Sequence, residues 1–312
     1  MTIVFIIIGI LLFLLLGYNY LSGKALIRDF ILHLQLKNKN LKSLDEKWGK
    51  SNKKSDVIVS FTTIPERIEN IAGTIKSLLI QKELPKRINI YLPYKSFRNG
   101  KEYIIPEWLQ NLQSVNLVRI ETDYGPATKF IPAILTQDPD QKILVTDDDN
   151  IYPSDYITEL NQASDQYPDK VVAASGWRVP EDLIDRPTTL ISNLLKKAPT
   201  PVPGTRVTKP YSIDILQGYS AFLFKPKFFN SDEVTNYEGV PNNIRFVDDV
   251  WVSAHCRVEK IVVPMSRYCF TPFFEHDFFK SSSLAKINNW GKEDYSQRNN
   301  SIAIKFFEEK WK

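Results

Sequence analysis

The feature that most constrains the fold is a short apolar run that ends in three consecutive acids. Residues 143–145 read Ile-Leu-Val, and after Thr146 residues 147–149 are all Asp. A short apolar run of this kind is typical of a buried strand. In an open α/β sheet, ligands collect beyond the carboxyl ends of the strands. We therefore expect a strand of an α/β sheet with its acids at the edge where ligands bind.

Three adjacent carboxylates repel one another, and each is costly to remove from water unless something neutralises its charge. A divalent cation does this, and carboxylate oxygens suit Mg²⁺, Ca²⁺ or Mn²⁺. Because side chains alternate along an extended chain, we expect Asp147 and Asp149 on one side and Asp148 pointing elsewhere. The simpler interpretation is a polar turn that closes the strand, since Asp and Asn are common in turns.

Two other acid-rich motifs fit the residues less well. An EF-hand loop needs a third oxygen ligand and then Gly, and this chain has Ile151 and Tyr152 in those places. Phosphatases of the haloacid-dehalogenase type carry Asp-x-Asp after the first strand of their domain. Here the acids lie in the middle of the chain, behind several predicted strands.

The composition limits the classes of protein to consider. The chain has 312 residues, which suits one large or two small domains. Its 40 basic and 36 acidic residues leave a formal charge of +4, too small to indicate a nucleic-acid partner. The two cysteines, Cys256 and Cys269, form no disulfide framework, and a reducing compartment is the simpler interpretation.

The N-terminal segment predicts a membrane anchor. Residues 3–21 contain no charged side chain, and a membrane helix needs about 20 such residues. A cleaved signal peptide fits less well, because no basic region precedes the apolar run and no Ala-x-Ala site follows it. Basic residues come after the run, so the positive-inside rule predicts a single-pass membrane protein with a cytoplasmic body. A Golgi-type anchor with a lumenal body is the alternative.

We divide the chain into three parts: an anchor over 1–22, a basic juxtamembrane stalk over 23–55, and a globular domain over 56–312. The stalk carries apolar residues at helical spacing, namely Leu26, Ile27, Phe30, Ile31 and Leu34. This helix can lie on anionic lipid head groups, or it can pack on the next domain.

The globular domain alternates between strand and helix patterns. Strands are predicted over 56–61, 88–92 and 115–121, with helices over 68–81 and 156–166. This order predicts an α/β fold with a mostly parallel sheet flanked by helices. The Pro-rich segment 198–205 predicts a lid, a binding loop or a disordered stretch, and residues 293–312 predict an exposed amphipathic helix.

Three further places carry candidate functional residues. In the segment Asp123 to Lys129, Gly125-Pro126 breaks the chain before a helix, so Lys129 can contact a diphosphate or can be an ordinary exposed lysine. Gly218 and Tyr219 lie in a turn where an acceptor can bind.

A second pair of acids, Asp248 and Asp249, begins a predicted helix. Such acids are either ordinary caps or, between aromatic neighbours, a general base. His276 is the histidine best placed as a metal ligand or phosphate contact, although a single His is more often only hydrogen-bonded.

Taken together, residues 56–280 resemble a nucleotide-sugar glycosyltransferase of the GT-A fold, close to the family 2 type. Residues 57–67 resemble the first strand and turn of that family, which hold the nucleotide base, and residues 123–129 resemble its second nucleotide-contacting segment. Residues 147–149 match its Asp-x-Asp metal motif, and Asp248-Asp249 resembles the late acid pair. The first turn departs from the commonest spelling, and no Gln-x-x-Arg-Trp follows the second pair, which argues against a processive synthase.

The resemblance implies transfer of a sugar from a nucleotide-sugar donor to a glycan or lipid-linked acceptor, with Mn²⁺ or Mg²⁺ and inversion at the anomeric carbon. It implies Asp249 as the catalytic base beside Asp248, and Asp147 and Asp149 as metal ligands. To these ligands we add His276, chosen for its place in the chain and not from the resemblance. The implied substrate contacts are Thr63, Pro65, Arg67, Asp123, Gly125, Lys129, Asp147, Asp148, Gly218 and Tyr219. A metal-dependent phosphohydrolase or nucleotidyltransferase and a non-catalytic membrane-anchored binding protein are the alternatives.

Overall fold

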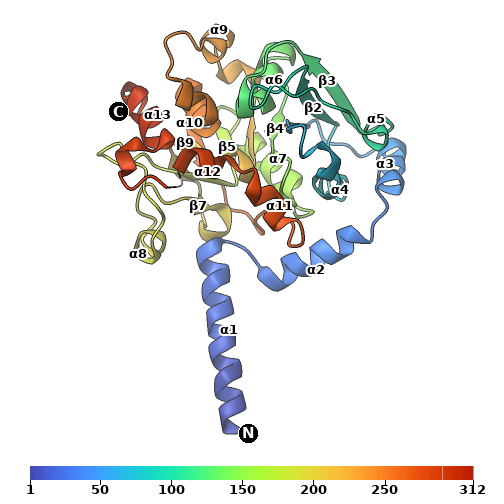
Figure 1. Cartoon of the computed structure of the whole chain (residues 1–312). Helices are drawn as coiled ribbons and strands as arrows, with labels where there is room; N and C mark the ends of the chain where they lie inside the picture. Colours follow the sequence, from blue (N-terminus) through green and yellow to red (C-terminus); the bar gives the residue numbers. More distant parts are fainter. Residues whose placement is uncertain (290, 312) are drawn as a thin grey trace.

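The computed structural model describes residues 1–289 and 291–311, and its largest element is an eight-stranded sheet (Figure 1). The strand order is β3-β2-β1-β4-β10-β5-β11-β8. The strands are β1 (Ile58–Phe61), β2 (Arg87–Pro93), β3 (Val115–Ile120), β4 (Ile143–Val145), β5 (Val171–Ala173), β8 (Tyr211–Ile213), β10 (Phe222–Phe224) and β11 (Lys260–Val262). Within this sheet of the described residues, only β10 and β8 pair antiparallel to their neighbours. The predicted mostly parallel α/β sheet is therefore confirmed.

The chain reverses its direction of travel across the sheet between β1 and β4. It moves outward from β1 through β2 to β3, then returns so that β4 pairs with the other side of β1. Such a switch point leaves a crevice beyond the carboxyl ends of the two strands. The turn after β1, residues 62–67, and the acids after β4 both lie there.

Helices cover both faces of the sheet, and the alternation of side chains along β1 divides the core. Val59 and Phe61 belong to one apolar cluster, with α4 (Ala72–Leu79) and α7 (Tyr156–Gln166). Ile58 belongs to the other, with α6 (Ile131–Thr136) and α10 (Asp248–His255). The remaining helices of the body are α5 (Glu107–Gln110), α8 (Leu190–Leu194), α9 (Ser231–Thr235), α11 (His276–Ser281), α12 (Leu284–Asn289) and α13 (Asn299–Phe306).

The N-terminal helix α1 (Thr2–Ser22) projects from the body (Figure 1). Among the described residues it is the one helix long and apolar enough to cross a membrane, judged by length and composition. It ends at Gly23, whose positive φ of 73° makes a left-handed cap that favours glycine.

Residues 26–50 form two helices that pack on the body. Helix α2 (Leu26–Lys37) buries Leu32 and Leu36 beside Ile151, and α3 (Leu41–Lys50) buries Leu44 in the main core. The side chain of Asp45 accepts hydrogen bonds from the backbone N–H groups of residues 113 and 114. The division of the chain at residues 22 and 55 stays a prediction.

Two predictions about segments are wrong in part. Residues 198–205 are not a free loop: β7 (Val202–Pro203) pairs with β6 (Ser175–Trp177), which also pairs with β9 (Ile215–Leu216). Pro203 is accommodated because β7 is an edge strand. The C-terminal helix α13 is not simply exposed, because it buries Ala303 and Ile304 against the body.

Candidate active site

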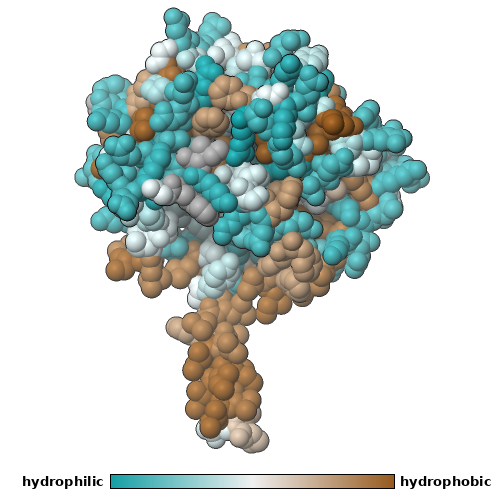
Figure 2. All heavy atoms as spheres, in the orientation of Figure 1, coloured by the Kyte–Doolittle hydropathy of each residue, from teal (hydrophilic) through white to brown (hydrophobic). Residues whose placement is uncertain are grey.

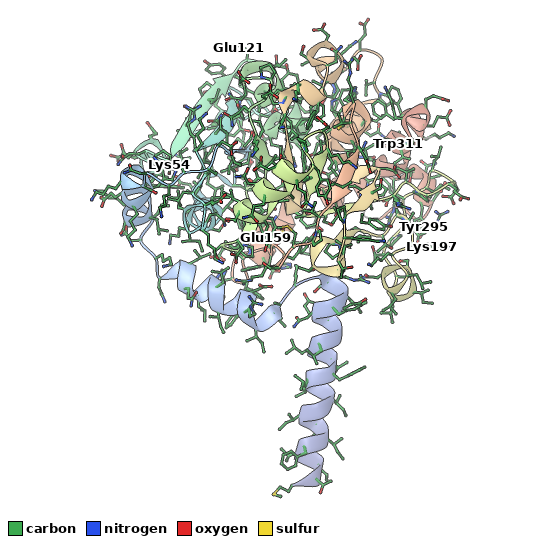
Figure 3. The ribbon with its side chains drawn as sticks, turned by 180° about the vertical axis from the view of Figure 1, so that it is seen from behind. Lys54, Glu121, Glu159, Lys197, Tyr295 and Trp311 are labelled. Carbon is green, nitrogen blue, oxygen red and sulfur yellow. The ribbon has the colours of Figure 1, made fainter. Side chains whose placement is uncertain are left out.

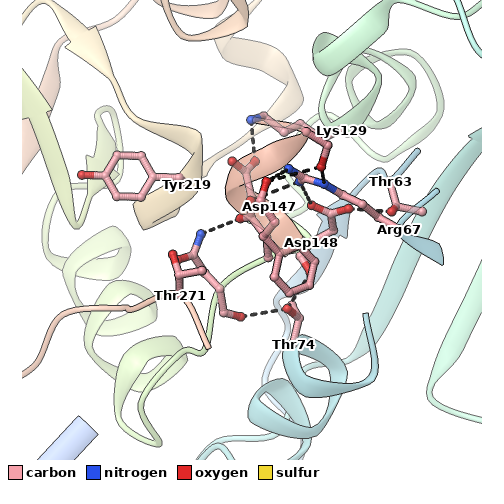
Figure 4. A network of polar contacts seen from close by, with 12 residues as sticks. Thr63, Arg67, Thr74, Lys129, Asp147, Asp148, Tyr219 and Thr271 are labelled. Carbon is pink, nitrogen blue, oxygen red and sulfur yellow. Dashed lines mark hydrogen bonds and ion pairs between the residues drawn. The ribbon is translucent and has the colours of Figure 1, made fainter. Parts of the chain in front are cut away.

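A cavity of about 490 Å³ opens beyond the carboxyl ends of β1 and β4. It is lined by the turn after β1, the acids after β4, the start of α10 and the segment after α11. Figure 4 shows a network of polar contacts at this cavity, in which Thr63 and Arg67 come from the turn after β1 and Asp147 and Asp148 from the acids after β4.

The three acids after β4 point to different partners. Asp148 is buried and accepts hydrogen bonds from the Thr63 hydroxyl at 2.5 Å and from the Arg67 guanidinium at 2.9 Å. Asp149 accepts from the same guanidinium at 3.1 Å, while Asp147 pairs with Lys129. The expectation that Asp147 and Asp148 diverge is met, but Arg67 draws Asp149 toward Asp148.

Arg67 holds the turn after β1 against the C-terminal part of the chain. Its remaining N–H groups donate to the Ser282 hydroxyl and to the Phe279 carbonyl, both at 2.8 Å. Burial works against its charge, but Asp148 and Asp149 outweigh that effect and raise its pKa. The Asp-rich turn is therefore neutralised in part by a cation that the fold itself supplies.

Lys129 connects the two acid clusters. Its Nζ lies 2.6 Å from a carboxylate oxygen of Asp147 and 2.7 Å from one of Asp248, and the residue is only 5% exposed. Burial alone would lower the pKa of this lysine, but Asp147, Asp248 and Asp249 raise it well above its usual value. It is thus not the exposed first-turn lysine of the simpler interpretation.

The second acid pair sits in the first turn of α10. Asp249 accepts a hydrogen bond from the backbone N–H of Gly218 at 2.8 Å. Burial, and then the charge of Asp248, raise the pKa of Asp249 to about 8. A carboxyl group with such a pKa can accept a proton near neutral pH, as a general base does.

The network carries more acid than base. Asp147 to Asp149 and Asp248 and Asp249 supply five carboxylates, which contact two cations, Arg67 and Lys129. Arg98 and Lys24 also line the cavity, as does a sixth acid, Asp123, so acids still outnumber bases. Burial and the charges of Asp148 and Asp147 raise the pKa of Asp149 to about 7. This excess of negative charge favours an additional cation.

The donor set fits a divalent metal ion. Asp147 and Asp149 line the cavity with partly exposed carboxylates, the ligands that Mg²⁺ and Mn²⁺ prefer. Among the described residues no group of three or more His, Cys, Asp or Glu side chains is arranged to hold a metal ion. A metal here would therefore be held by two carboxylates together with oxygens of a bound phosphate or water.

Most of the other predicted site residues also line this cavity. They are Thr63, Arg67, Asp123, Gly125 and Tyr219. The Asp123 carboxylate accepts from the backbone N–H groups of Phe97 and Gly125, which positions the loop between β3 and α6. The Tyr219 hydroxyl is 2.8 Å from that of Tyr268.

Three predicted residues lie differently. Gly218 contacts Asp249 through its backbone, and Pro65 is not among the residues that line the cavity. His276 does not line it either: its exposed ring begins α11 and lies 3.3 Å from Asp277. The structure therefore does not bring His276 to the acids that it was predicted to join, because α11 begins on the surface.

Several lining residues escaped the sequence reasoning. Asn150 is buried, and its amide donates to Asp149 at 2.9 Å. Its position directly after the acids is a signal that could have identified it. Gln217, from the turn that also holds Gly218 and Tyr219, lines the cavity as well. Ser282 lines it too, but no pattern in the sequence marks that residue.

We expect Gly218→Ala to damage the site. A Cβ at this position would lie 2.4 Å from Lys129 Nζ and 3.3 Å from an Asp249 oxygen. Lys129 cannot move aside without leaving Asp147 or Asp248, so the variant should lose about 1–3 kcal/mol of unfolding free energy. Gly73→Ala is the matched control, since its Cβ would only touch Ile151 at 3.5 Å within helix α4. Equal melting temperatures for the two variants would contradict this account of Gly218.

No protein-family model and no curated protein matches the chain. Among solved structures, it is similar to S. aureus TarS residues 1–349, with 14% identity, a TM-score of 0.40, and coverage of 74% of this chain and 63% of that one. The same protein in complex with UDP gives 13% identity, a TM-score of 0.40 and coverage of 74% and 64%. GalNAc-T7 with UDP, GalNAc and Mn²⁺ gives 15% identity, a TM-score of 0.41 and coverage of 68% and 42%. The chain thus spans less than two thirds of each neighbour, and similarity at this level carries no argument about activity.

Proposed function

We propose that the protein is a glycosyltransferase that moves a sugar from a nucleoside-diphosphate sugar to an acceptor hydroxyl. The observation that best supports this proposal is that the acids after β4 and those at the start of α10 line one cavity and share Lys129. One acid cluster suits a metal-bound diphosphate, and the other suits a hydroxyl that must lose its proton. Transfer of a sugar from the diphosphate to the hydroxyl needs both acid clusters in the same cavity.

On the donor side, Asp147 and Asp149 would hold the metal, which as a Lewis acid neutralises charge on the diphosphate when bound. Lys129 lies beside Asp147 and adds a positive charge at the same edge. The backbone of residues 123–129 and the turn of Thr63 to Arg67 form the walls on either side. These residues bind and orient the donor, so that its anomeric carbon faces α10.

On the acceptor side, Asp249 removes the hydroxyl proton. The bond between the anomeric carbon and the phosphate oxygen breaks, and its electron pair stays on the diphosphate. The acceptor oxygen forms the new bond to the same carbon, while its proton passes to Asp249. Attack from the face opposite the diphosphate inverts the centre, and a product of retained configuration would overturn this part of the proposal.

The pKa of Asp249 predicts how activity depends on pH. The base acts only when deprotonated, and Asp248, Asp147 and Lys129 are the charged groups that influence its pKa of about 8. Between pH 6 and 8, kcat/KM should therefore rise by about fiftyfold in total, and it should level off above pH 8. A profile that is flat over this range would exclude Asp249 as the base.

A product assay tests the function itself. The full-length protein is incubated with UDP-, GDP- and TDP-sugars and membrane extract, with and without Mn²⁺. We expect metal-dependent transfer of the sugar from one donor, lost in Asp149→Ala and in Asp249→Ala. A phosphohydrolase would instead release phosphate without an acceptor. A non-catalytic binding protein would consume no donor.

Helix α1 is best interpreted as a single-pass anchor. The backbone at the C-terminal end of α1 is hydrogen-bonded to the body. The Leu21 carbonyl accepts from the Asn193 side chain, and the Gly23 carbonyl accepts from the Thr205 hydroxyl. A segment destined for removal needs no such contacts. The basic residues after α1 favour a body on the cytoplasmic side.

A further inference from the structure

Two helices beside the end of α1 present large apolar side chains to the outside. On α8, Leu190 is 62% exposed and Ile191 is 70% exposed, and Leu195 directly after the helix is 71% exposed. A single exposed leucine needs no explanation, but a cluster on one short helix marks an interaction site. We define the basal surface as the outward residues of α2 (Ile27, Phe30, Ile31 and Leu34) and of the α8 region (Leu190, Ile191, Leu194 and Leu195).

On an ordinary surface helix the polar side chains face water and the apolar ones face the core, and on α8 this arrangement is reversed. Its polar residue Asn193 turns inward, where the side-chain amide donates to the Leu21 carbonyl at 3.1 Å. Arg206 in turn donates to the Asn193 carbonyl at 2.9 Å. The hydrogen bonds of Asn193 thus hold α8 to the end of α1, and its apolar side chains are left facing away from the core.

Helix α2 is apolar on two opposite sides. Its inner side buries Leu32 and Leu36. Its outer side carries Ile27, Phe30, Ile31 and Leu34, spaced i, i+3, i+4 and i+7, which is one continuous stripe of a helix. Phe30 lies at the edge of this stripe, where its ring also contacts Phe273 and Phe274. A helix that only covers a core needs apolar residues on its inner side alone, so the exposed outer stripe calls for another partner.

The parts of the basal surface meet around the point where α1 leaves the body. The Leu26 N–H at the start of α2 donates to the Asn19 side chain of α1, and α8 contacts Leu21. Figure 1 shows α2 and α8 on either side of the upper end of α1, and Figure 2 shows hydrophobic atoms gathered on the underside of the body around it. Basic residues lie next to these residues in the sequence, namely Lys24, Arg28, Lys37, Lys196 and Lys197. The Lys196 ammonium donates to the Arg206 carbonyl.

We propose that the basal surface lies in the interfacial layer of the membrane that α1 enters, and that the acceptor hydroxyl is carried on a membrane lipid. A bilayer is the partner that best fits this surface, because the surface surrounds the end of α1. If α1 spans a membrane, the residues around its end lie at the lipid head groups. Apolar side chains bordered by lysine and arginine are typical of helices that lie in an interface.

The lining of the cavity reaches the base of the body. Lys24, two residues beyond the end of α1, lines it together with Cys269 and Thr271. A hydroxyl attached to a lipid head group can therefore enter without leaving the membrane surface. This part rests on the proposed function, whereas the seating of the body on the membrane does not.

Site-specific fluorescence tests the seating. An environment-sensitive NBD label is placed at Ile31→Cys on α2 and at Ile191→Cys on α8 in the full-length protein, in nanodiscs with doxyl-labelled lipids. The control is Glu121→Cys, because Glu121 is exposed at the end of the body opposite α1 (Figure 3). Labelled unsubstituted protein corrects for Cys256 and Cys269. We expect a blue shift and quenching at both test positions and neither at residue 121. Quenching that stays at the control level at either helix overturns the proposal.

A transfer assay in the same nanodiscs tests the lipid acceptor. The variant carries Ile27→Ser, Ile31→Ser, Ile191→Ser and Leu195→Ser, and the control carries Ile104→Ser and Leu135→Ser, exposed apolar residues outside the basal surface. We expect transfer to the lipid fraction to fall about tenfold or more in the variant, with hydrolysis of the donor by water unchanged in both proteins. Equal lipid transfer by variant and control, or transfer only to water-soluble sugars, overturns the lipid acceptor. If no nucleotide sugar is consumed at all, the proposed function fails, and the fluorescence result still decides the seating.

Discussion

Asp249→Asn should lower kcat by about a thousandfold, the middle of the range for a general base, and should also make the protein more stable. Asparagine keeps an oxygen that can accept from the Gly218 N–H, so the local backbone has no reason to move. What it removes is a buried carboxylate next to Asp248. Burial beside Asp248 raises the pKa of Asp249 and so suits it to act as a base. The same burial of a carboxylate lowers the stability of the folded protein.

The sign of the stability effect follows from the pKa. The folded protein holds the Asp249 proton with a pKa of about 8, against an ordinary value of 3.8. The stability gained from this proton is present at low pH and is lost as the pH rises through this range. At pH 8, Asp249→Asn should exceed the parent protein by up to about 5 kcal/mol of unfolding free energy, and at pH 5 by less than about 2 kcal/mol.

Activity assays and urea unfolding at pH 5 and 8 measure the two effects. Asp277→Asn is the control, because its side chain is fully exposed and should change neither quantity. A variant at position 249 that retains kcat within a few-fold of the parent would show that another group takes the acceptor proton.

Lys129→Met should destabilise the protein by about 3–5 kcal/mol at pH 8, the usual cost of removing one partner of a buried ion pair. The substitution leaves Asp147 and Asp248 without the ammonium group that lies 2.6 and 2.7 Å from them. Met fills a similar volume, so the loss reflects charge more than packing.

Most of this loss should come from the two carboxylates, Asp147 and Asp248, that are left without a cation. Adding Asp147→Asn and Asp248→Asn to Lys129→Met should recover most of the lost free energy at pH 8. Lys76→Met is the matched control, since the Lys76 ammonium donates to the Leu36 carbonyl and not to a carboxylate. Equal losses for the two lysines in urea unfolding would contradict the proposed coupling of the acid clusters.

Local patterns in the sequence predicted the elements well where the signal is local. The run 143–145 is a strand, and the predicted helix 156–166 matches α7. Such patterns are informative because a buried strand or a buried helix face requires apolar residues at regular intervals along the sequence. The mostly parallel character of the sheet followed from the alternation of strands and helices, whereas its strand order was not predicted.

The partners of the acids could not be predicted in this way. Arg67 lies 81 residues before Asp148, and their contact depends on the pairing of β1 with β4. The closure of the site by residues 279–282 depends on the same long-range geometry, since Arg67 also holds that segment. His276 was placed at the metal from its residue type and its place in the chain, and neither determines where a surface helix begins.

The outward apolar side chains of α8 were missed for a related reason. The Pro-rich sequence on its C-terminal side predicted a loop, and a five-residue helix leaves too short a pattern to detect. Its orientation is determined by Asn193 and Arg206, which meet only in the folded chain.

The central claim is that both acid clusters serve one centre, and anomalous scattering from Mn²⁺ in a crystal with a bound nucleoside diphosphate tests it most directly. UDP and GDP are screened first by the rise in melting temperature, and the one with the larger rise is crystallised. The account predicts a manganese peak at the carboxylates of Asp147 and Asp149, and a diphosphate in the cavity that Asp249 also lines. A peak elsewhere, or a nucleotide bound outside that cavity, would contradict it.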